Sequence, residues 1–117
     1  MGIKENTVSA EKQTRERGNV FYYGSEKADK KILIVGNSIT YHAPKEDIDW
    51  NNSWGMAASR AENDYVHILT GKILSQAPAN IMVAQLADME VAINNGSFCV
   101  KDYVSEREFA PDILIFK

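Results

Sequence analysis

The sequence contains a single cysteine, Cys99, in 117 residues. One cysteine cannot form an intramolecular disulfide, so the protein does not depend on an oxidising compartment. The first thirty residues also lack an apolar run of the length that a signal peptide or a membrane-spanning helix needs. We therefore expect a cytoplasmic protein without a membrane partner.

An excess of positive charge is also missing. Thirteen Lys and Arg residues stand against sixteen Asp and Glu residues, which gives a net charge of -3. Such a chain has no broad attraction for the phosphate backbone of nucleic acids, so no nucleic-acid partner is expected. The hydrophobic share of 44% and the charged share of 25% are typical of globular proteins, and a chain this short predicts one domain.

Three short aliphatic or β-branched runs predict buried strands at residues 31–35, 80–86 and 112–116. Between the first two, residues 59–62 have the Ser-x-x-Glu spacing of a capping box, and apolar residues at helical spacing follow from 65 to 73. Helical patterns also occupy 88–93 and 100–109, before Pro111.

The alternation of strands and helices predicts an α/β fold with a parallel sheet and helices on both faces. Residues 1–30 are interpreted as a polar N-terminal extension, in which residues 20–23 are either an extra edge strand or a docking arm. A parallel sheet of three strands is small, and its last strand has a bare edge. We therefore expect residues 31–117 to be the N-terminal portion of a larger domain, truncated after the third strand, or a subunit that completes its sheet by association.

Ligands of such sheets bind beyond the carboxyl ends of the strands, which directs attention to the residues after Val35. The segment 36–40 reads Gly-Asn-Ser-Ile-Thr. Gly36 permits a tight turn, and the Ser38 hydroxyl would then face a substrate beside backbone N–H groups that stabilise an oxyanion. The alternative is that Ser38 or Thr40 simply caps a helix.

Residues 32–40 resemble the first motif of the SGNH, or GDSL-type, hydrolases, which reads Gly-Asp-Ser-Leu/Ile-Ser/Thr after the first strand. Residues 54–59 and 64–67 are similar to a bacterial subgroup of that superfamily, and the resemblance spans residues 31–117. It implies a flavodoxin-like sheet of strand order 2-1-3 and a serine ester hydrolase that needs no cofactor.

The resemblance assigns the nucleophile to Ser38, supported by Gly36, Asn37 and Thr40 of the same motif. Asn37 replaces the more usual aspartate of the family, at a position that braces the loop.

The oxyanion donors implied by the resemblance are the N–H of Ser38 and that of Ala87, which stands where the family commonly has glycine. Gly55 is the substitute for Ala87.

The Gly-x-Asn and Asp-x-x-His motifs, which supply the third oxyanion donor and the base, are expected beyond residue 117. Without a base a serine hydroxyl is a poor nucleophile, so we expect this chain alone to be inactive. The expected substrate is a small-molecule ester, and a small acyl group on a carbohydrate is favoured. Trp50 and Trp54 would stack on the sugar or line an acyl pocket, or else pack their loop onto the body of the domain.

A local base is the alternative, because His42 follows Ser38 by four residues and Asp47 or Asp49 would orient its ring. Pro44 keeps any helix there very short, so a solvated loop histidine is the favoured interpretation of His42. These residues lack a recognised metal-ligand spacing, so no metal is predicted. His67 is expected to face solvent.

The rival to the hydrolase is a non-catalytic binding or assembly module. In it, residues 36–40 cradle an anion and the edge of strand 112–116 pairs with a second copy or with the missing C-terminal part. A nucleotide-binding flavodoxin-like domain is a third possibility, although the loop lacks the glycine-rich or lysine-bearing phosphate signatures.

Overall fold

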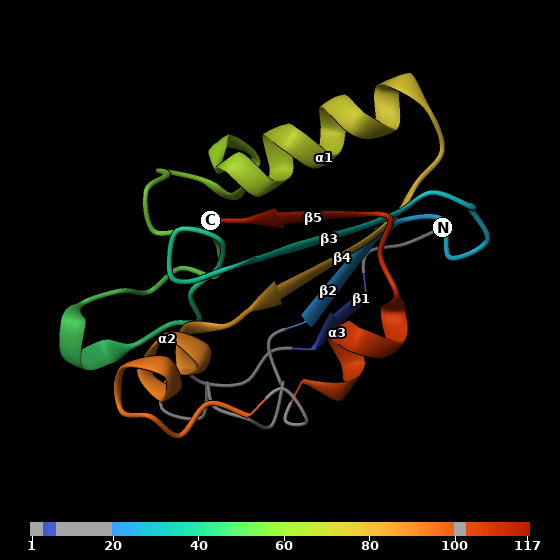
Figure 1. Cartoon of the computed structure of the whole chain (residues 1–117). Coiled ribbons are helices and arrows are strands. Elements are labelled where there is room, and N and C mark those ends of the chain that lie inside the picture. Colours follow the sequence, from blue (N-terminus) through green and yellow to red (C-terminus); the bar gives the residue numbers. More distant parts are fainter. Residues whose placement is uncertain (1–3, 7–19, 100–102) are drawn as a thin grey trace.

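The computed structural model describes residues 4–6, 20–99 and 103–117 (Figure 1). The strands in these residues are β1 (Lys4–Asn6), β2 (Val20–Gly24), β3 (Lys31–Gly36), β4 (Asn80–Gln85) and β5 (Ile113–Phe116). The helices are α1 (Tyr65–Gln76), α2 (Ala87–Asn94) and α3 (Val104–Phe109), with short 3-10 turns at Glu46–Ile48 and Ala61–Asn63.

The strands form one mixed sheet in the order β1-β2-β4-β3-β5. The strands predicted from the aliphatic runs are confirmed: β3 lies between β4 and β5 and is parallel to both, in the order 2-1-3. The sheet as a whole is not parallel, because β2 is antiparallel to β4 and β1 is antiparallel to β2. The structure is therefore of the α/β class with a mixed sheet.

Part of the predicted N-terminal extension belongs to this sheet. β2 pairs with β4 from Val20↔Ala84 to Gly24↔Asn80, and the Val20 and Phe21 side chains are buried. Residues 20–23 are thus a strand inside the sheet, with β1 outside it. Two apolar residues at the start of β2 give this segment a place against β4, which would otherwise have a bare edge.

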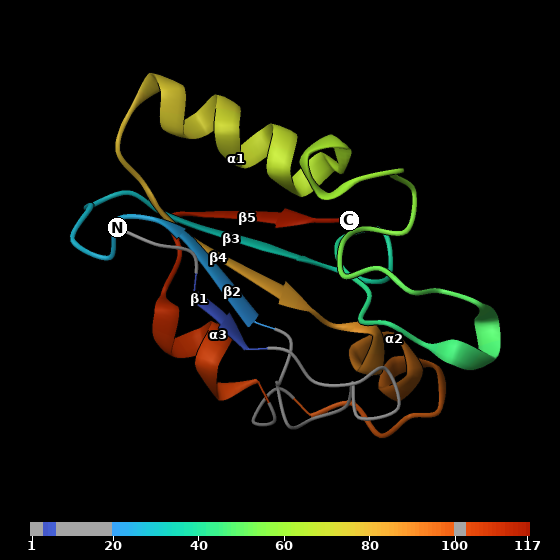
Figure 2. The same cartoon turned by 180° about the vertical axis from the view of Figure 1, so that it is seen from behind.

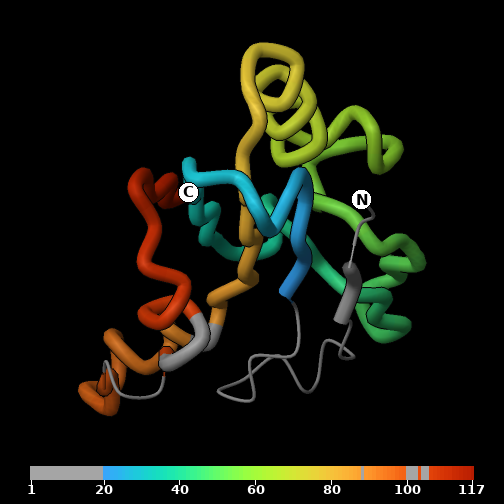
Figure 3. The backbone as a smooth tube through the Cα atoms, turned by 90° about the vertical axis from the view of Figure 1, so that its right-hand side faces the viewer, coloured from blue at the N-terminus to red at the C-terminus, as the bar shows by residue number. Residues whose placement is uncertain are grey.

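Helices cover both faces of the sheet, as predicted (Figures 1 and 2). Successive residues of β3 alternate between two cores: Ile32 and Ile34 pack under α1, whereas Leu33 and Val35 pack with Met89 of α2 and Phe109 of α3. In the side view, α1 and α2 lie at opposite ends of the molecule (Figure 3). Burial on both faces therefore places β3 at the centre of the three parallel strands β4, β3 and β5, here called the parallel unit.

The start of α1 differs from the predicted capping box. Asp64 is the N-cap, and its carboxylate accepts the backbone N–H of His67 at 2.8 Å. Ser59 is exposed, and a 3-10 turn separates it from the helix. A buried carboxylate at the helix end outcompetes a solvated hydroxyl five residues earlier, because it adds charge complementarity to the cap hydrogen bond.

The outer edge of β5 carries exposed apolar side chains. The exposed fractions are 46% for Ile113, 57% for Leu114 and 67% for Phe116. Within the described residues no strand pairs with this edge, so its backbone hydrogen-bonding groups face outward.

Candidate functional site

The segment 36–40, here called the serine turn, leaves the carboxyl end of β3 and reverses the chain at once. The N–H groups of Thr40 and Tyr41 both donate to the Asn37 carbonyl, at 2.9 and 3.2 Å. The Asn37 side-chain oxygen accepts the N–H of Ile39 at 3.3 Å, which matches the bracing role expected of this position. The turn does not open a regular helix, so the interpretation of Ser38 as a helix cap is wrong.

Gly36 is needed where it stands. A Cβ atom on Gly36 would overlap the Thr40 hydroxyl and the Lys117 carbonyl oxygen. The Gly36 carbonyl also accepts the N–H of Leu86 at 2.7 Å, which joins the turn to the end of β4. The turn can fold this tightly against its neighbours only with glycine at its base.

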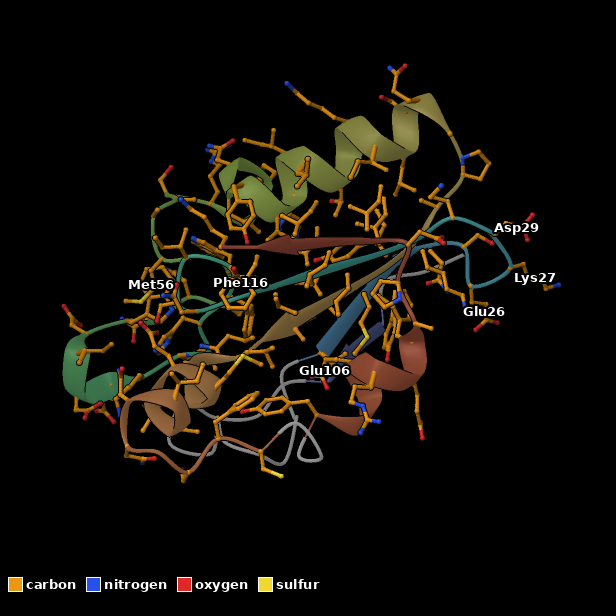
Figure 4. All side chains as sticks on the ribbon, in the orientation of Figure 1. Glu26, Lys27, Asp29, Met56, Glu106 and Phe116 are labelled. Carbon is orange, nitrogen blue, oxygen red and sulfur yellow. The ribbon has the colours of Figure 1, made fainter. Side chains whose placement is uncertain are left out.

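Ser38 is half-buried on this turn. Its carbonyl accepts the N–H of Met56 at 2.9 Å. In the described residues, neither its N–H nor its hydroxyl takes part in a hydrogen bond. Met56 and Phe116 lie at the same end of the molecule, where β3 and β5 run out (Figure 4). The residue predicted as nucleophile therefore lies at the carboxyl edge of the parallel strands, and its hydroxyl and backbone N–H make no hydrogen bond within the described residues.

The proposed local base does not assemble. His42 is buried, and its Nδ1 lies 2.6 Å from the Ala43 carbonyl. The backbone N–H of His42 donates to the Trp54 carbonyl. Asp47 is exposed and pairs with Lys45 instead, at 3.2 Å. Across residues 20–99 and 103–117, no hydrogen bond joins Ser38 to an imidazole or a carboxylate. His42 thus holds its own loop, and the alternative of a solvated loop histidine is also wrong.

The two other predicted oxyanion donors are already engaged. The Gly55 N–H donates to Asp64 Oδ2 at 3.0 Å in a buried bond, so Gly55 does not serve as the substitute donor. The Ala87 N–H donates to Oε1 of Gln85 at 3.1 Å. Gln85 is itself buried, and its Nε2 has no partner among the described residues. The Ala87 N–H can therefore reach a substrate only if the Gln85 side chain moves away from it.

Both tryptophans serve the packing of their loop. The Trp50 indole N–H donates to the His42 carbonyl at 3.1 Å, and that of Trp54 donates to the Ala58 carbonyl at 2.8 Å. Their rings meet edge to face with centroids 6.1 Å apart. These contacts show that both indoles pack within their loop, while the stacking of a sugar on their ring faces stays a prediction.

A cavity of about 300 Å³ opens at the carboxyl ends of β3, β4 and β5. Its walls include Gly36 and Asn37 of the serine turn, together with the apolar side chains of Leu86, Met89 and Phe116. A concave apolar site beside a few polar groups is the usual form of a small-molecule site.

A polar cluster under α1 was missed by the sequence reasoning. His67 was expected to face solvent, yet its Nδ1 lies 2.7 Å from Asp64 Oδ1 and its Nε2 lies 3.4 Å from the Tyr23 hydroxyl. These three residues and Thr40 border a second cavity of about 110 Å³. The signal was present, because residues 64–67 themselves have Asp-x-x-His spacing, but the partner Tyr23 comes from β2, which the sequence did not place.

The Asp64 side chain is 3% exposed. Burial alone would raise the pKa of its carboxyl group, but hydrogen bonds from the His67 side chain and from the N–H groups of Gly55 and His67 outweigh burial and lower the pKa. The groups that contact the Asp64 carboxylate, the N–H groups of Gly55 and His67 and the His67 imidazole, therefore act as donors to it. The imidazole that it orients faces Tyr23 rather than Ser38.

Two further features bear on the possible class of site. Among the described residues, no three His, Cys, Asp or Glu side chains gather closely enough to hold a metal ion. Of the helices in the described part of the chain, none is both long and apolar enough to cross a bilayer.

Comparisons of the chain with protein-family models, with curated proteins and with solved structures find no match.

Proposed function

We propose that this chain carries the nucleophile segment of a serine ester hydrolase, with Ser38 as the nucleophile. The observation that carries the proposal is the placement of Ser38 on a glycine-dependent turn at the carboxyl end of β3, with its hydroxyl and N–H unengaged among the described residues. This is the position in which parallel α/β sheets bind their ligands.

In this reaction Ser38 Oγ attacks the acyl carbon of a small-molecule ester, and the alkoxide leaves after a tetrahedral intermediate forms. The Ser38 N–H donates to the oxyanion, and the Ala87 N–H joins it when the Gln85 side chain rotates away. Water then releases the acid and regenerates the hydroxyl. The proton of Ser38 needs a base from outside the described residues, as the SGNH resemblance implies for a complete flavodoxin-like domain.

The cavity beside Gly36 and Asn37 favours the acyl side of the substrate, because its walls are largely apolar. Removal of a small acyl group from a carbohydrate remains the proposed reaction on the strength of the resemblance. The proposed compartment is the cytoplasm, and no cofactor is proposed.

The test is fluorophosphonate labelling of the protein as its native host produces it, followed by mass mapping of the modified peptide. We expect one adduct at Ser38 that disappears in Ser38→Ala. Ser53→Ala is the matched control, because Ser53 is an exposed serine of the neighbouring loop, and it should label like the unaltered protein. An adduct at another serine, or no adduct, would overturn the proposal.

The exposed edge of β5 favours a second candidate, a non-catalytic assembly module. In that case the serine turn binds an anion reversibly and β5 pairs with another chain. Saturable binding of inorganic phosphate that is lost in Ser38→Ala, in a protein that forms no fluorophosphonate adduct, would support the module over the hydrolase.

A further inference from the structure

We propose that Asp64 is a positioning residue for Ser38, acting from the first turn of α1 through Gly55 and Met56. The inference rests on the proposed function for its catalytic meaning. The contacts that carry it are independent of any reaction.

The first contact joins α1 to the loop at residues 55–56. Asp64 Oδ2 accepts the Gly55 N–H at 3.0 Å, and both residues are buried. A charge-assisted hydrogen bond away from water is short and directional, so it restricts the loop more than a solvated contact would.

The second contact joins that loop to the serine turn. The Met56 N–H donates to the Ser38 carbonyl at 2.9 Å. Next to it, Gly55 packs so closely on the Ile39 carbonyl that a Cβ atom would overlap the oxygen. Two consecutive residues therefore hold two consecutive peptide groups of the turn, and the peptide plane after Ser38 is fixed on one side.

The other oxygen of Asp64 is anchored within the helix. Oδ1 accepts the His67 N–H at 2.8 Å and lies 2.7 Å from His67 Nδ1. The imidazole in turn contacts Tyr23 of β2, where the rings meet edge to face with centroids 5.7 Å apart. The carboxylate is therefore held in position before it reaches Gly55, which makes it a rigid support for the loop.

The consequence for catalysis is orientation. The proposed reaction needs the Ser38 hydroxyl and N–H to converge on one substrate carbonyl, and errors of about 1 Å in such groups cost roughly a hundredfold in rate. Asp64 touches neither group. It acts by limiting the rotation of the peptide that follows Ser38, and that restriction is what the experiment has to detect.

The test compares Asp64→Ser with Ile73→Ala by amide hydrogen exchange on the full chain. Serine still caps a helix, but its side chain is too short to reach the Gly55 N–H. Ile73 packs on the same core from farther along α1, so its truncation weakens the helix without touching residues 55–56. We expect the Met56 amide to exchange about tenfold faster in Asp64→Ser, relative to core amides of β4, as loss of one buried charge-assisted bond predicts.

In Ile73→Ala the ratio of Met56 exchange to β4 exchange should stay that of the unaltered protein. An unchanged ratio in Asp64→Ser, or an equal change in both variants, would overturn the positioning role. If Asp64→Ser does not fold, Asp64→Asn takes its place in the test. Its single side-chain oxygen cannot accept from both Gly55 and His67.

Fluorophosphonate labelling of the host-produced protein supplies the second readout. We expect Asp64→Ser, and not Ile73→Ala, to slow labelling at Ser38. Absence of labelling in the unaltered protein refutes the hydrolase while the exchange ratio still tests the contact. Normal labelling in Asp64→Ser refutes the positioning role and leaves the hydrolase standing.

Discussion

The hydroxyl oxygen of Tyr65 lies 2.6 Å from that of Thr40. Tyr65 is the first residue of α1, and Thr40 is the buried last residue of the serine turn. Burial raises the pKa of Tyr65, and the negative charge of Asp64 raises it further. The hydrogen bond with Thr40 lowers the pKa by less, so the pKa of Tyr65 lies above its ordinary value. The phenol therefore stays protonated, and Tyr65 contacts the serine turn directly, whereas the neighbouring Asp64 reaches it through Gly55 and Met56.

Tyr65→Phe should destabilise the protein by about 1–3 kcal/mol, because it leaves the Thr40 hydroxyl buried without its partner. Adding Thr40→Val should recover much of that loss, since both polar groups are then gone. Urea unfolding of the two single variants and the double variant gives the coupling between them. Additive effects in that cycle would show that the two hydroxyls do not interact.

The hydrogen bonds to Asp64 should make stability depend on pH in the acid range. Because the pKa of folded Asp64 lies below its ordinary value of 3.8, its contribution is fully present above that value and is lost as the pH falls through the folded pKa. Asp64→Asn should therefore cost about 1.5–3 kcal/mol at neutral pH. The difference from the unaltered protein should shrink as the pH falls below 3.8 and through the lowered pKa of folded Asp64.

Urea unfolding across the same pH range measures this difference. Asp47→Asn is the control, because Asp47 is exposed and its pair with Lys45 is a surface ion pair worth about 0–1 kcal/mol. A constant cost of Asp64→Asn from neutral to acid pH would contradict the assignment of Asp64 as a carboxylate stabilised by donors.

Two glycine-to-alanine changes should act in opposite directions. Gly55→Ala places a methyl group against the Ile39 carbonyl, so we expect a loss of about 1–3 kcal/mol from overpacking. Gly71→Ala lies within α1 with nothing near its added Cβ, and should raise stability by about 0.5–1 kcal/mol through helix propensity. Thermal unfolding of the two variants measures whether each change lowers or raises the stability of the protein. A Gly55→Ala variant as stable as the unaltered protein would mean that the loop has room to move away from the serine turn.

The parallel unit could be predicted from the sequence because its signals are local. Each of β3, β4 and β5 is a short aliphatic run, and the helices between them leave few other arrangements. The serine turn was also predictable, since Gly36 and Ser38 follow a strand at the edge where ligands bind. β2 was not placed, because a strand that pairs with β4 across some sixty residues carries no local mark of its partner.

The same limit explains what was wrong in the site. Gly55 looked like a spare N–H donor because a sequence does not show which acceptor a loop amide meets, and the acceptor is Asp64, nine residues away. His67 looked exposed because helical spacing alone places it opposite Leu69. Its neighbour Tyr23 comes from β2, so the side of α1 that faces the sheet is wider than the apolar stripe indicates.

The open edge of β5 should drive association. Leu114 and Phe116 are 57% and 67% exposed on a strand whose outer backbone groups pair with no other strand in the described residues. Strands of this kind pair with other chains unless a charge interrupts them. We expect the chain to sediment faster than a 13.1 kDa monomer, and Leu114→Lys to shift it toward the monomer.

Ile68→Lys is the matched control, because it adds the same charge at an exposed apolar residue of α1, away from any strand edge, and should leave association unchanged. Equal effects of the two lysines would mean that net charge governs association. A monomer at all concentrations would show that this edge is not a pairing surface in the chain alone, which would remove the observation that favours the assembly module.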